Sequence, residues 1–311
     1  MNTAELNDRL LDSIGAEKHA YNAPDRARLT IHQNKVIDSH LVDGLDVQTE
    51  ELSDGVSVTL NLPDDTVIEH PVHMCFGVIP KEGVQRIRLS VTIGKNSLIS
   101  LLAHCSFPFA EKVRHIMDAQ ITLDEGARYS YFERHVHSES GGVEVIPKAR
   151  ITVGPHAVFK TEFELIKGRV GVMDIEYETF VQKHGLVDMT ARISGSADDS
   201  IKLSEIANLN GEYARSVLTS KIAVRDRARA EIYNRITANA PNARGHVDCK
   251  EIVKDDGIAV AIPVVDVRNA LAHVTHEAAV GSVDKKQLET LMARGLDEDE
   301  ASELIIQGLL S

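Results

Sequence analysis

Three side chains near the C-terminal end of the sequence could bind a metal ion together. Cys249 supplies a thiol, and His276 and Glu277 follow it as an adjacent pair further along the chain. Thiolate sulfur, imidazole nitrogen and carboxylate oxygen are common protein ligands of zinc and iron. The three residues end a long run of strand-like sequence, and stacked strands could bring them close. The spacing therefore indicates a candidate metal site.

Each of these residues also has a common structural interpretation. Cys249 lies in the alternating segment GHVDCKEIV, and a lone cysteine on a strand is usually a small buried hydrophobic residue. Its polar neighbours argue against an inert thiol, and Lys250 would favour the thiolate. His276 and Glu277 should point to opposite faces of a regular strand, so they bind one ion together only across a bulge. Their alternatives are a half-buried imidazole and a solvated acid.

The remaining cysteines and one histidine pair are weaker candidates for metal ligands. Cys75 and Cys105 lie in the apolar segments HMCFGVIP and LLAHCSFPF, for which packing in the core is the favoured interpretation. His135 and His137 should share one strand face and could chelate zinc, but two histidines do not complete a site. Cys249 therefore remains the main candidate.

The motifs that are missing exclude several kinds of chemistry. The sequence has no G-x-x-x-x-G-K-[ST] segment, so the chain should not bind and hydrolyse ATP by itself. G-x-S-x-G, H-E-x-x-H and G-x-G-x-x-G are also missing. Because no C-x-x-C spacing is present, an iron–sulfur cluster here would be sparsely ligated, labile or shared between subunits.

Composition limits the partners and the compartment. The net charge of −13 disfavours nucleic acid, and the 4 % of aromatic residues leaves few stacking platforms. The longest apolar run, 258–265, is far shorter than the roughly 20 residues that span a bilayer. The N-terminal segment lacks the apolar region of a secretory signal. Three widely spaced cysteines argue against disulfides, so we expect a cytoplasmic protein without a membrane partner.

Most of the chain is predicted to be β-structure. Residues 56–281 consist of short alternating segments bounded by Gly, Asp, Asn or Pro. Similar motifs recur with a period of about 30 residues, at Ile121, Ile151 and Val181 and again at Ile193 and Ile222. Uniform repetition without helices predicts either a solenoid of stacked β-coils or a long β-sandwich.

Helical segments are predicted at both ends. In the N-terminal region, residues 1–55, Thr3 can cap a first helix and Gly15 can end it, and residues 16–50 read as irregular. In the C-terminal region, residues 282–311, two capping boxes predict a helical hairpin. The apolar face of its second helix is expected to contain Ala301, Leu304, Ile305 and Leu309.

The sequence from about Ser194 to the end resembles the SufB/SufD family of iron–sulfur cluster assembly proteins. The resemblance rests on the segments NARGHVDCKEIV, VDVRNALAHVTHEA and ARGLDEDEASELIIQG. It implies a mainly β fold, namely a right-handed parallel β-helix core with flanking N- and C-terminal helical segments. The short chain resembles the compact SufB/SufD-like form of archaea and some anaerobes.

The resemblance implies an assembly scaffold rather than an enzyme. It implies a homodimer formed through the β-helix core and a SufC-type ABC ATPase docked on the C-terminal helices. The cofactor implied is a transient iron–sulfur cluster at the dimer interface. A sulfur donor and apo-protein acceptors are the further partners implied.

The resemblance also implies roles for the candidate ligands. Cys249 corresponds to the SufB cysteine proposed to anchor the cluster, Glu277 to the SufB interface glutamate and His276 to a histidine of SufD. A homodimer would then hold every donor type that a SufB–SufD pair assembles from two chains. Val274 stands where SufD has a cysteine. Mixed ligation binds iron less tightly than four thiolates do, which suits a scaffold that must release its product.

Two other functions compete with the scaffold. A β-helix enzyme acting on acidic polysaccharide would require stacking aromatic residues and usually a secretory signal, and both are lacking. A structural adaptor could recruit an ABC-type ATPase without binding a cluster itself. The adaptor predicts that Cys249→Ser leaves activity intact, whereas the scaffold predicts its loss.

Overall fold

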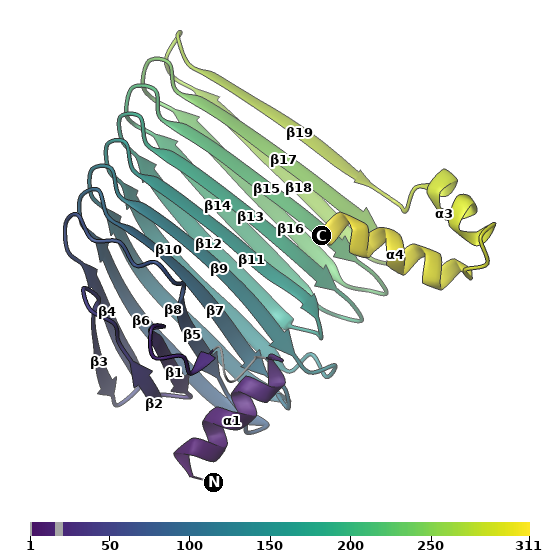
Figure 1. Ribbon diagram of the computed structural model, residues 1–311. Coiled ribbons are helices and arrows are strands. Elements are labelled where there is room, and N and C mark those ends of the chain that lie inside the picture. The colour runs from purple at the N-terminus through teal and green to yellow at the C-terminus, as the bar shows by residue number, and fades with distance from the viewer. Residues whose placement is uncertain (1, 16–20) are drawn as a thin grey trace.

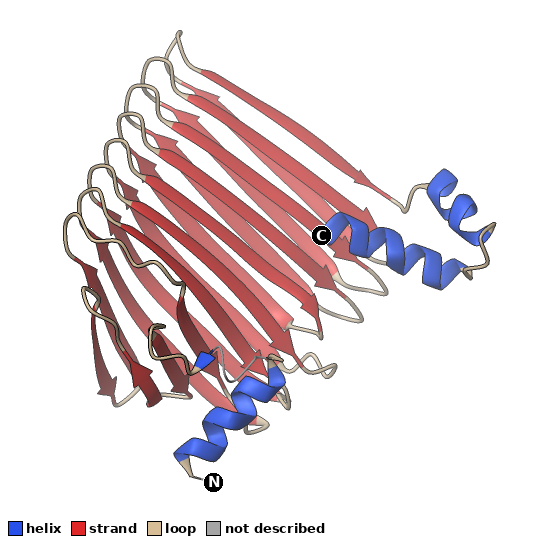
Figure 2. Cartoon of the chain, viewed as in Figure 1, coloured by secondary structure: helices blue, strands red, loops and turns tan. Residues whose placement is uncertain are grey.

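The computed structural model describes residues 2–15 and 21–311. Within them the chain passes back and forth between two facing sheets, making a β-solenoid of about eight turns (Figure 1). The three described helices lie at the two ends of the chain (Figure 2). The predicted parallel β-helix is therefore confirmed, because from β4 and β5 onward neighbouring strands of each sheet belong to successive coils and run parallel.

The described strands divide into a sheet of ten and a sheet of nine. In spatial order, the ten-stranded sheet contains β19 (His273–Gly281), β17 (Arg244–Val253), β15 (Arg215–Val224), β13 (Leu186–Gly195), β11 (Val158–Lys167), β9 (Arg128–His137), β7 (Leu98–Phe107), β5 (Val72–Gly77), β1 (Arg28–His32) and β2 (Lys35–His40). The nine-stranded sheet contains β18 (Ile258–Val267), β16 (Arg229–Ala238), β14 (Ser200–Leu209), β12 (Gly171–Val181), β10 (Val143–Val153), β8 (Lys112–Leu123), β6 (Glu82–Ile93), β4 (Gly55–Leu62) and β3 (Asp46–Leu52).

The loose sequence repeat corresponds to the coils of the solenoid. Ile121 pairs with Ile151, and Ile193 pairs with Ile222, so these equivalent positions lie directly above one another. Val181 pairs with Val153 rather than Ile151, because the coil from β10 to β12 is shorter than the coil from β8 to β10. The difference is an even number of positions, which keeps every side chain on its own face, since the side-chain period of a strand is two.

The core lies between the two sheets. Alternate residues of each strand point inward and form one continuous apolar cluster from Ala27 to Cys249. The outward positions carry ion pairs between neighbouring coils, such as Arg114 with Glu144 at 2.8 Å and Lys148 with Glu176 at 2.9 Å. Surface pairs of this kind stabilise a protein only slightly, so burial of the inner face holds the coils together.

One corner of the solenoid stacks equivalent turn residues in the left-handed backbone region. His156, His184 and Tyr213 have φ values of 57°, 56° and 58°. Their rings stack with centroids 4.7 Å and 5.0 Å apart. This repetition of one turn conformation aligns successive coils, and it fixes which residues of different strands face each other inside.

The strands begin earlier than the sequence pattern indicates. The segment 16–50, which reads as irregular, contains β1 and β2 and most of β3. Residues 16–20 of that segment lie outside the described residues. The strands β1 and β3 each pair with a neighbour in the antiparallel sense. These hairpins cover the N-terminal end of the solenoid.

The first helix, α1 (Thr3–Ser13), is capped one residue earlier than expected. Asn2 rather than Thr3 is the N-cap, since its side chain accepts a bond from Glu5 N and Glu5 accepts one from Asn2 N. Gly15, with φ of 65°, follows the helix end as predicted. Leu10 packs with Cys75 and Ile79 on the outer side of the ten-stranded sheet.

The C-terminal hairpin contains α3 (Lys285–Met292) and α4 (Glu298–Leu310). Asp284 and Asp297 cap them as the sequence predicts, but the complete capping box is present only in α4. The buried face of α4 is displaced from the expected one: it contains Ala301, Ser302, Ile306 and Leu310, whereas Leu304 is 47 % exposed. No helix in the described part of the chain is long and apolar enough to cross a membrane.

Candidate functional site

Cys249 lies in the last but one coil and points into the solenoid. It occupies β17, where Val247, Cys249 and Glu251 form the buried inner face. Its side chain is fully buried, and the amide of Asn234 on β16 lies 3.8 Å from its sulfur. Burial raises the pKa of the Cys249 thiol, and hydrogen bonding from Ser220 and Asn234 opposes that rise.

The expected effect of Lys250 on this thiol is wrong. Lys250 points to the outer face of the sheet, where its Nζ lies 2.9 Å from Asp248. Strand alternation separates it from Cys249, since adjacent residues point to opposite faces. The inner neighbours of the thiol instead include Ser220, Asn234 and Glu251. Burial therefore favours the protonated form of this thiol.

His276 lies on the same inner face as Cys249, one coil further along. It belongs to β19, where it pairs with Val247, while Ala278 pairs with Cys249. The two side chains are thus diagonal neighbours on adjacent parallel strands, with Cα atoms roughly 8 Å apart from strand spacing and rise. His276 is exposed because no further coil covers β19.

Glu277 lies on the opposite, outer face of β19. It pairs with Asp248. The hydrogen bond from Lys250 to Asp248 is the main cause that raises the pKa of Lys250, and Glu277 adds to it. The pairing of β17 with β19 is regular, so no bulge turns Glu277 inward. Cys249, His276 and Glu277 are not among the described groups whose ligand atoms lie within 4.8 Å of one another. Within one protomer, the structure brings Cys249 and His276 to one face and leaves Glu277 on the other.

The inner neighbourhood of Cys249 contains two buried acids that the sequence analysis missed. Burial raises the pKa of Glu251 to about 7 and the pKa of Glu205 to about 8. Ser220 pairs with Cys249 from the preceding coil and lies 3.4 Å from Glu251 Oε1. The sequence repeat could have revealed Ser220, because it occupies the position equivalent to Cys249 one coil earlier. Glu205 lies in the other sheet, and the repeat alone does not reveal it.

The coil that contains His276 is the uncovered C-terminal end of the solenoid. Strands β18 and β19 each have a neighbouring strand on one side only. Exposed apolar side chains accumulate on this coil, at 37–66 % exposure: Ile258, Val260, Ile262, Val265, Val267, Leu271 and Val280. Open strand edges beside exposed apolar residues are normally covered by another chain or element.

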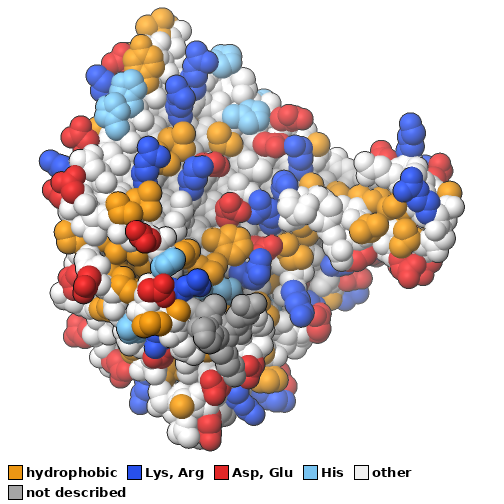
Figure 3. Space-filling view, in the orientation of Figure 1, with side chains coloured by type: hydrophobic (Ala, Val, Ile, Leu, Met, Phe, Trp, Pro, Cys, Tyr) orange, Lys and Arg blue, Asp and Glu red, His pale blue; other side chains and the backbone are white. Residues whose placement is uncertain are grey.

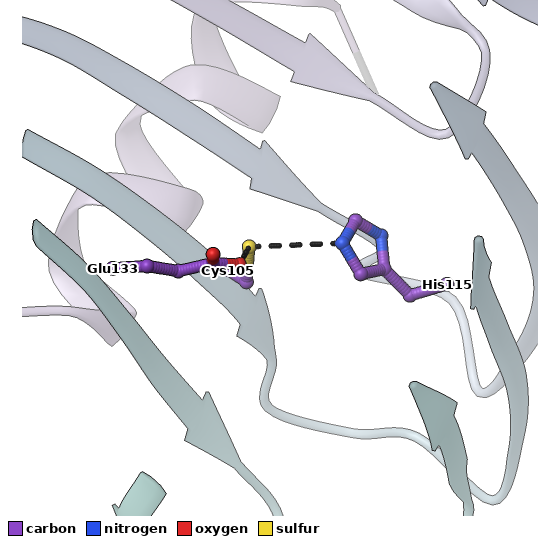
Figure 4. Close-up of side chains that lie close together, drawn as sticks. All are labelled: Cys105, His115 and Glu133. Atoms are coloured by element: carbon purple, nitrogen blue, oxygen red, sulfur yellow. Dashed lines mark hydrogen bonds between the residues drawn. The ribbon is translucent and has the colours of Figure 1, made fainter. Parts of the chain in front are cut away.

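A second group of ligand-type residues lies inside the N-terminal coils. Cys105, His115 and Glu133 converge there from β7, β8 and β9 (Figure 4). Cys105 and Cys75 are both buried, as the core interpretation predicts, but Cys105 has polar partners. His135 and His137 share the inner face as expected, and nitrogens of their two rings lie 3.1 Å apart. No local spacing indicates this convergence of three strands.

The fold and these residues together define a class of protein. It is a parallel β-solenoid that carries a buried thiol and an exposed inward-facing histidine at one open end, and a helical hairpin beside that end (Figure 1). A family profile described as "SUF system FeS cluster assembly, SufBD core domain" matches residues 78–309. The chain belongs to this SufBD family, whose members take part in iron–sulfur cluster assembly.

Curated relatives support the same assignment. An iron–sulfur cluster assembly SufBD family protein of Methanocaldococcus jannaschii is 36 % identical over 311 residues, which cover 98 % of both chains. One from Pyrococcus horikoshii is 34 % identical over 91 % of this chain and 86 % of its own. The iron–sulfur cluster assembly protein SufB of Bacillus subtilis is 22 % identical over 80 % of this chain and 54 % of its own.

Proposed function

We propose that this protein is the scaffold on which a nascent iron–sulfur cluster is built at the interface of a homodimer, with a SufC-type ATPase as its partner. One observation supports this most directly: Cys249 and His276 share the inner face of the two coils that end in an open edge. A cluster bound there would be cargo rather than a resident cofactor.

Dimer formation through the open end would place a second set of donors opposite the first. Covering β18 and β19 removes both exposed edges and the apolar surface of the terminal coil from water. Glu277 faces away from Cys249 of its own chain, so its carboxylate would serve the partner's half of the interface or an iron-entry step. Strand alternation keeps Glu277 away from Cys249 of the same chain, and two subunits would allow both residues to contribute to one interface.

The protonated, buried state of Cys249 suits a scaffold that is opened by its partner. A buried thiol is a poor metal ligand until its proton is displaced. Motion of the terminal coil would expose it, and the chain has no P-loop of its own to drive that motion. The C-terminal hairpin lies beside this end of the solenoid and is the proposed ATPase docking element (Figure 1).

Anaerobic reconstitution with iron and sulfide tests the proposal. We expect the wild type to develop sulfur-to-iron charge-transfer absorption and Cys249→Ser to lose most of it. Cys75→Ser is the matched control, because Cys75 is equally buried but packs under α1. An unchanged spectrum in Cys249→Ser would favour the structural adaptor over the scaffold.

A further inference from the structure

The N-terminal coils contain a closed cluster of metal-ligating side chains, far along the chain from Cys249. Cys105 and Glu133 come from the ten-stranded sheet and His115 from the nine-stranded sheet. None of the three is more than 1 % exposed. One ligand atom from each lies within 4.8 Å of the other two (Figure 4).

Two of the three spacings between these atoms match the edges of a small coordination sphere. The sulfur of Cys105 lies 3.7 Å from His115 Nε2 and 3.4 Å from Glu133 Oε1. Zinc bonds of about 2.0 Å to nitrogen or oxygen and about 2.3 Å to sulfur, at tetrahedral angles, place neighbouring ligand atoms roughly 3.2–3.8 Å apart. The third spacing, between the ligand atoms of His115 and Glu133, is at most 4.8 Å and would shorten where it exceeds this range when an ion binds.

The tautomer of the neutral His115 ring is fixed by Gln85. The amide nitrogen of Gln85 donates to the carbonyl oxygens of Ile31, Gln33 and Gly77. Its oxygen must therefore face His115 Nδ1, at 3.0 Å, and that nitrogen must carry the proton. The lone pair of His115 is left on Nε2, pointing toward Cys105. Partners of this kind hold metal-binding histidines in the correct tautomer.

Glu133 has one oxygen held in place and one without a partner. Its Oε1 lies 2.9 Å from His135 Nε2, whereas its Oε2 is buried and has no hydrogen-bond partner in the described part of the chain. His135 is held in turn by His137, whose Nδ1 lies 3.2 Å from the carbonyl oxygen of Arg169. An unpaired carboxylate oxygen in the interior is costly unless something binds it.

The charges also balance for one divalent ion. Binding would displace the proton of the Cys105 thiol, and the hydrogen bond with His135 Nε2 would hold Glu133 as a carboxylate. A thiolate, a carboxylate and a neutral imidazole around a doubly charged ion then form a neutral unit. Neutrality matters here because an uncompensated charge in a buried site is strongly unfavourable.

We propose that Cys105, His115 and Glu133 form a site for one divalent transition-metal ion of the zinc or iron(II) class, separate from the site at Cys249. One sulfur, one nitrogen and one oxygen ligand suit such borderline ions better than magnesium or calcium, which prefer oxygen alone. An ion held by both sheets would cross-link the N-terminal coils from the inside. Gln85 and His135 are positioning residues for its ligands.

Metal analysis of the purified chain tests this site. The protein is purified anaerobically, and zinc and iron per chain are measured by mass spectrometry. We expect close to one ion per chain in the wild type and a loss of at least about tenfold in Cys105→Ser and in Glu133→Gln. Cys75→Ser is the matched control for a buried cysteine and should keep the ion. The identity of the bound metal separates zinc from iron(II).

A second measurement does not require a ligand variant to fold. In the double variant Cys75→Ser with Cys249→Ser, Cys105 is the only cysteine in the chain. We expect Co²⁺ added to this metal-free protein to give a sulfur-to-cobalt charge-transfer band and intense tetrahedral visible bands. Because Cys249 is missing, a positive result is independent of the proposed cluster site.

Two results would overturn the proposal. One is equal metal content in the wild type, Cys105→Ser and Glu133→Gln. The other is a cobalt spectrum without sulfur charge transfer in the double variant. If Cys249→Ser loses cluster reconstitution but keeps the ion bound at Cys105, His115 and Glu133, the two sites are distinct.

Discussion

At the scale of single residues, one buried carboxyl group has no ion-pair partner among the described residues. Glu205 points into the solenoid from β14, is 3 % exposed, and has one oxygen without a hydrogen bond. Burial raises its pKa to about 8. The folded protein therefore keeps it protonated at neutral pH, whereas the unfolded chain ionises it near its ordinary value.

The consequence is a stability that falls as pH rises. Between about pH 4.5 and 8 the folded state binds the extra proton, so each pH unit removes up to about 1.4 kcal/mol of unfolding free energy. We expect Glu205→Gln to match the wild type near pH 5 and to be more stable by roughly 3–5 kcal/mol at pH 8.5. Urea unfolding across this range measures the difference.

Comparison of Glu205→Gln with the wild type cancels the contributions to the pH dependence of stability that both proteins share, such as those of the buried histidines. The raised pKa of Glu251 acts in the same direction as that of Glu205, so the slope should weaken in Glu205→Gln without disappearing. Glu231→Gln, on the exposed face of the adjacent β16, is the control and should leave the slope unchanged. A parallel pair of stability curves for Glu205→Gln and wild type would contradict the assignment.

At the scale of elements, the C-terminal hairpin is attached through one of its two helices. Ile306 and Leu310 of α4 pack against Ala223 and Ile252. Arg225 pairs with Glu303 of α4, and Lys254 lies 2.6 Å from Asp299. In α3, by contrast, no residue is buried. Figure 3 shows hydrophobic side chains gathered on this projecting segment.

Substitution of exposed apolar residues tests this hairpin as the ATPase docking element. Met292, the last residue of α3, is 42 % exposed. Leu304 of α4 is 47 % exposed and lies outside the buried face of that helix. We expect Met292→Glu with Leu304→Glu to abolish co-purification of a co-expressed SufC-type ATPase without changing the thermal midpoint. Removal of an exposed apolar contact weakens binding but not folding.

A matched control carries the same added charge on the same helices. Gln287 and Gln307 are also exposed, so Gln287→Glu with Gln307→Glu should retain the ATPase. Comparison of these two double variants is a more specific test than deletion of residues 284–311, because the deletion would also expose Ala223 and Ile252. Retention of the ATPase by the Met292 and Leu304 variant would place its docking surface elsewhere.

At the scale of the whole molecule, the two ends of the solenoid differ. At the N-terminal end the outermost strands, β2 and β3, belong to antiparallel hairpins, whereas at the C-terminal end the outermost strands, β18 and β19, run parallel to their neighbours. On the outer face of β18, Ile258, Val260 and Ile262 form an exposed apolar stripe. This asymmetry favours a dimer joined at the C-terminal ends over a longer filament.

We expect the wild type to be a dimer by light scattering and Val260→Lys with Ile262→Lys to be a monomer. A lysine on an edge strand opposes pairing with another chain, and burial of its charge would be unfavourable. Val172→Lys is the control, because Val172 is 44 % exposed but lies on a strand in the middle of the solenoid. Dimers that persist in the double variant would show that another surface joins the chains.

The sequence by itself determined the features that depend on local alternation and on the repeat. The period of about 30 residues and the alternation of inner and outer positions predicted either stacked β-coils or a long β-sandwich, and the family resemblance favoured the coils. The same alternation placed His276 and Glu277 on opposite faces. The capping residues of α3 and α4 were readable for the same local reason. Family segments near the C-terminal end indicated Cys249 as the central thiol.

Only the tertiary structure decided which residues meet across the interior. The convergence of Cys105, His115 and Glu133 depends on the register of three strands in two sheets, and the corners between the strands set that register. The same holds for Glu205 and Asn234 near Cys249. Local patterns fix the face of each side chain, but contact between distant segments depends on how every intervening coil is folded.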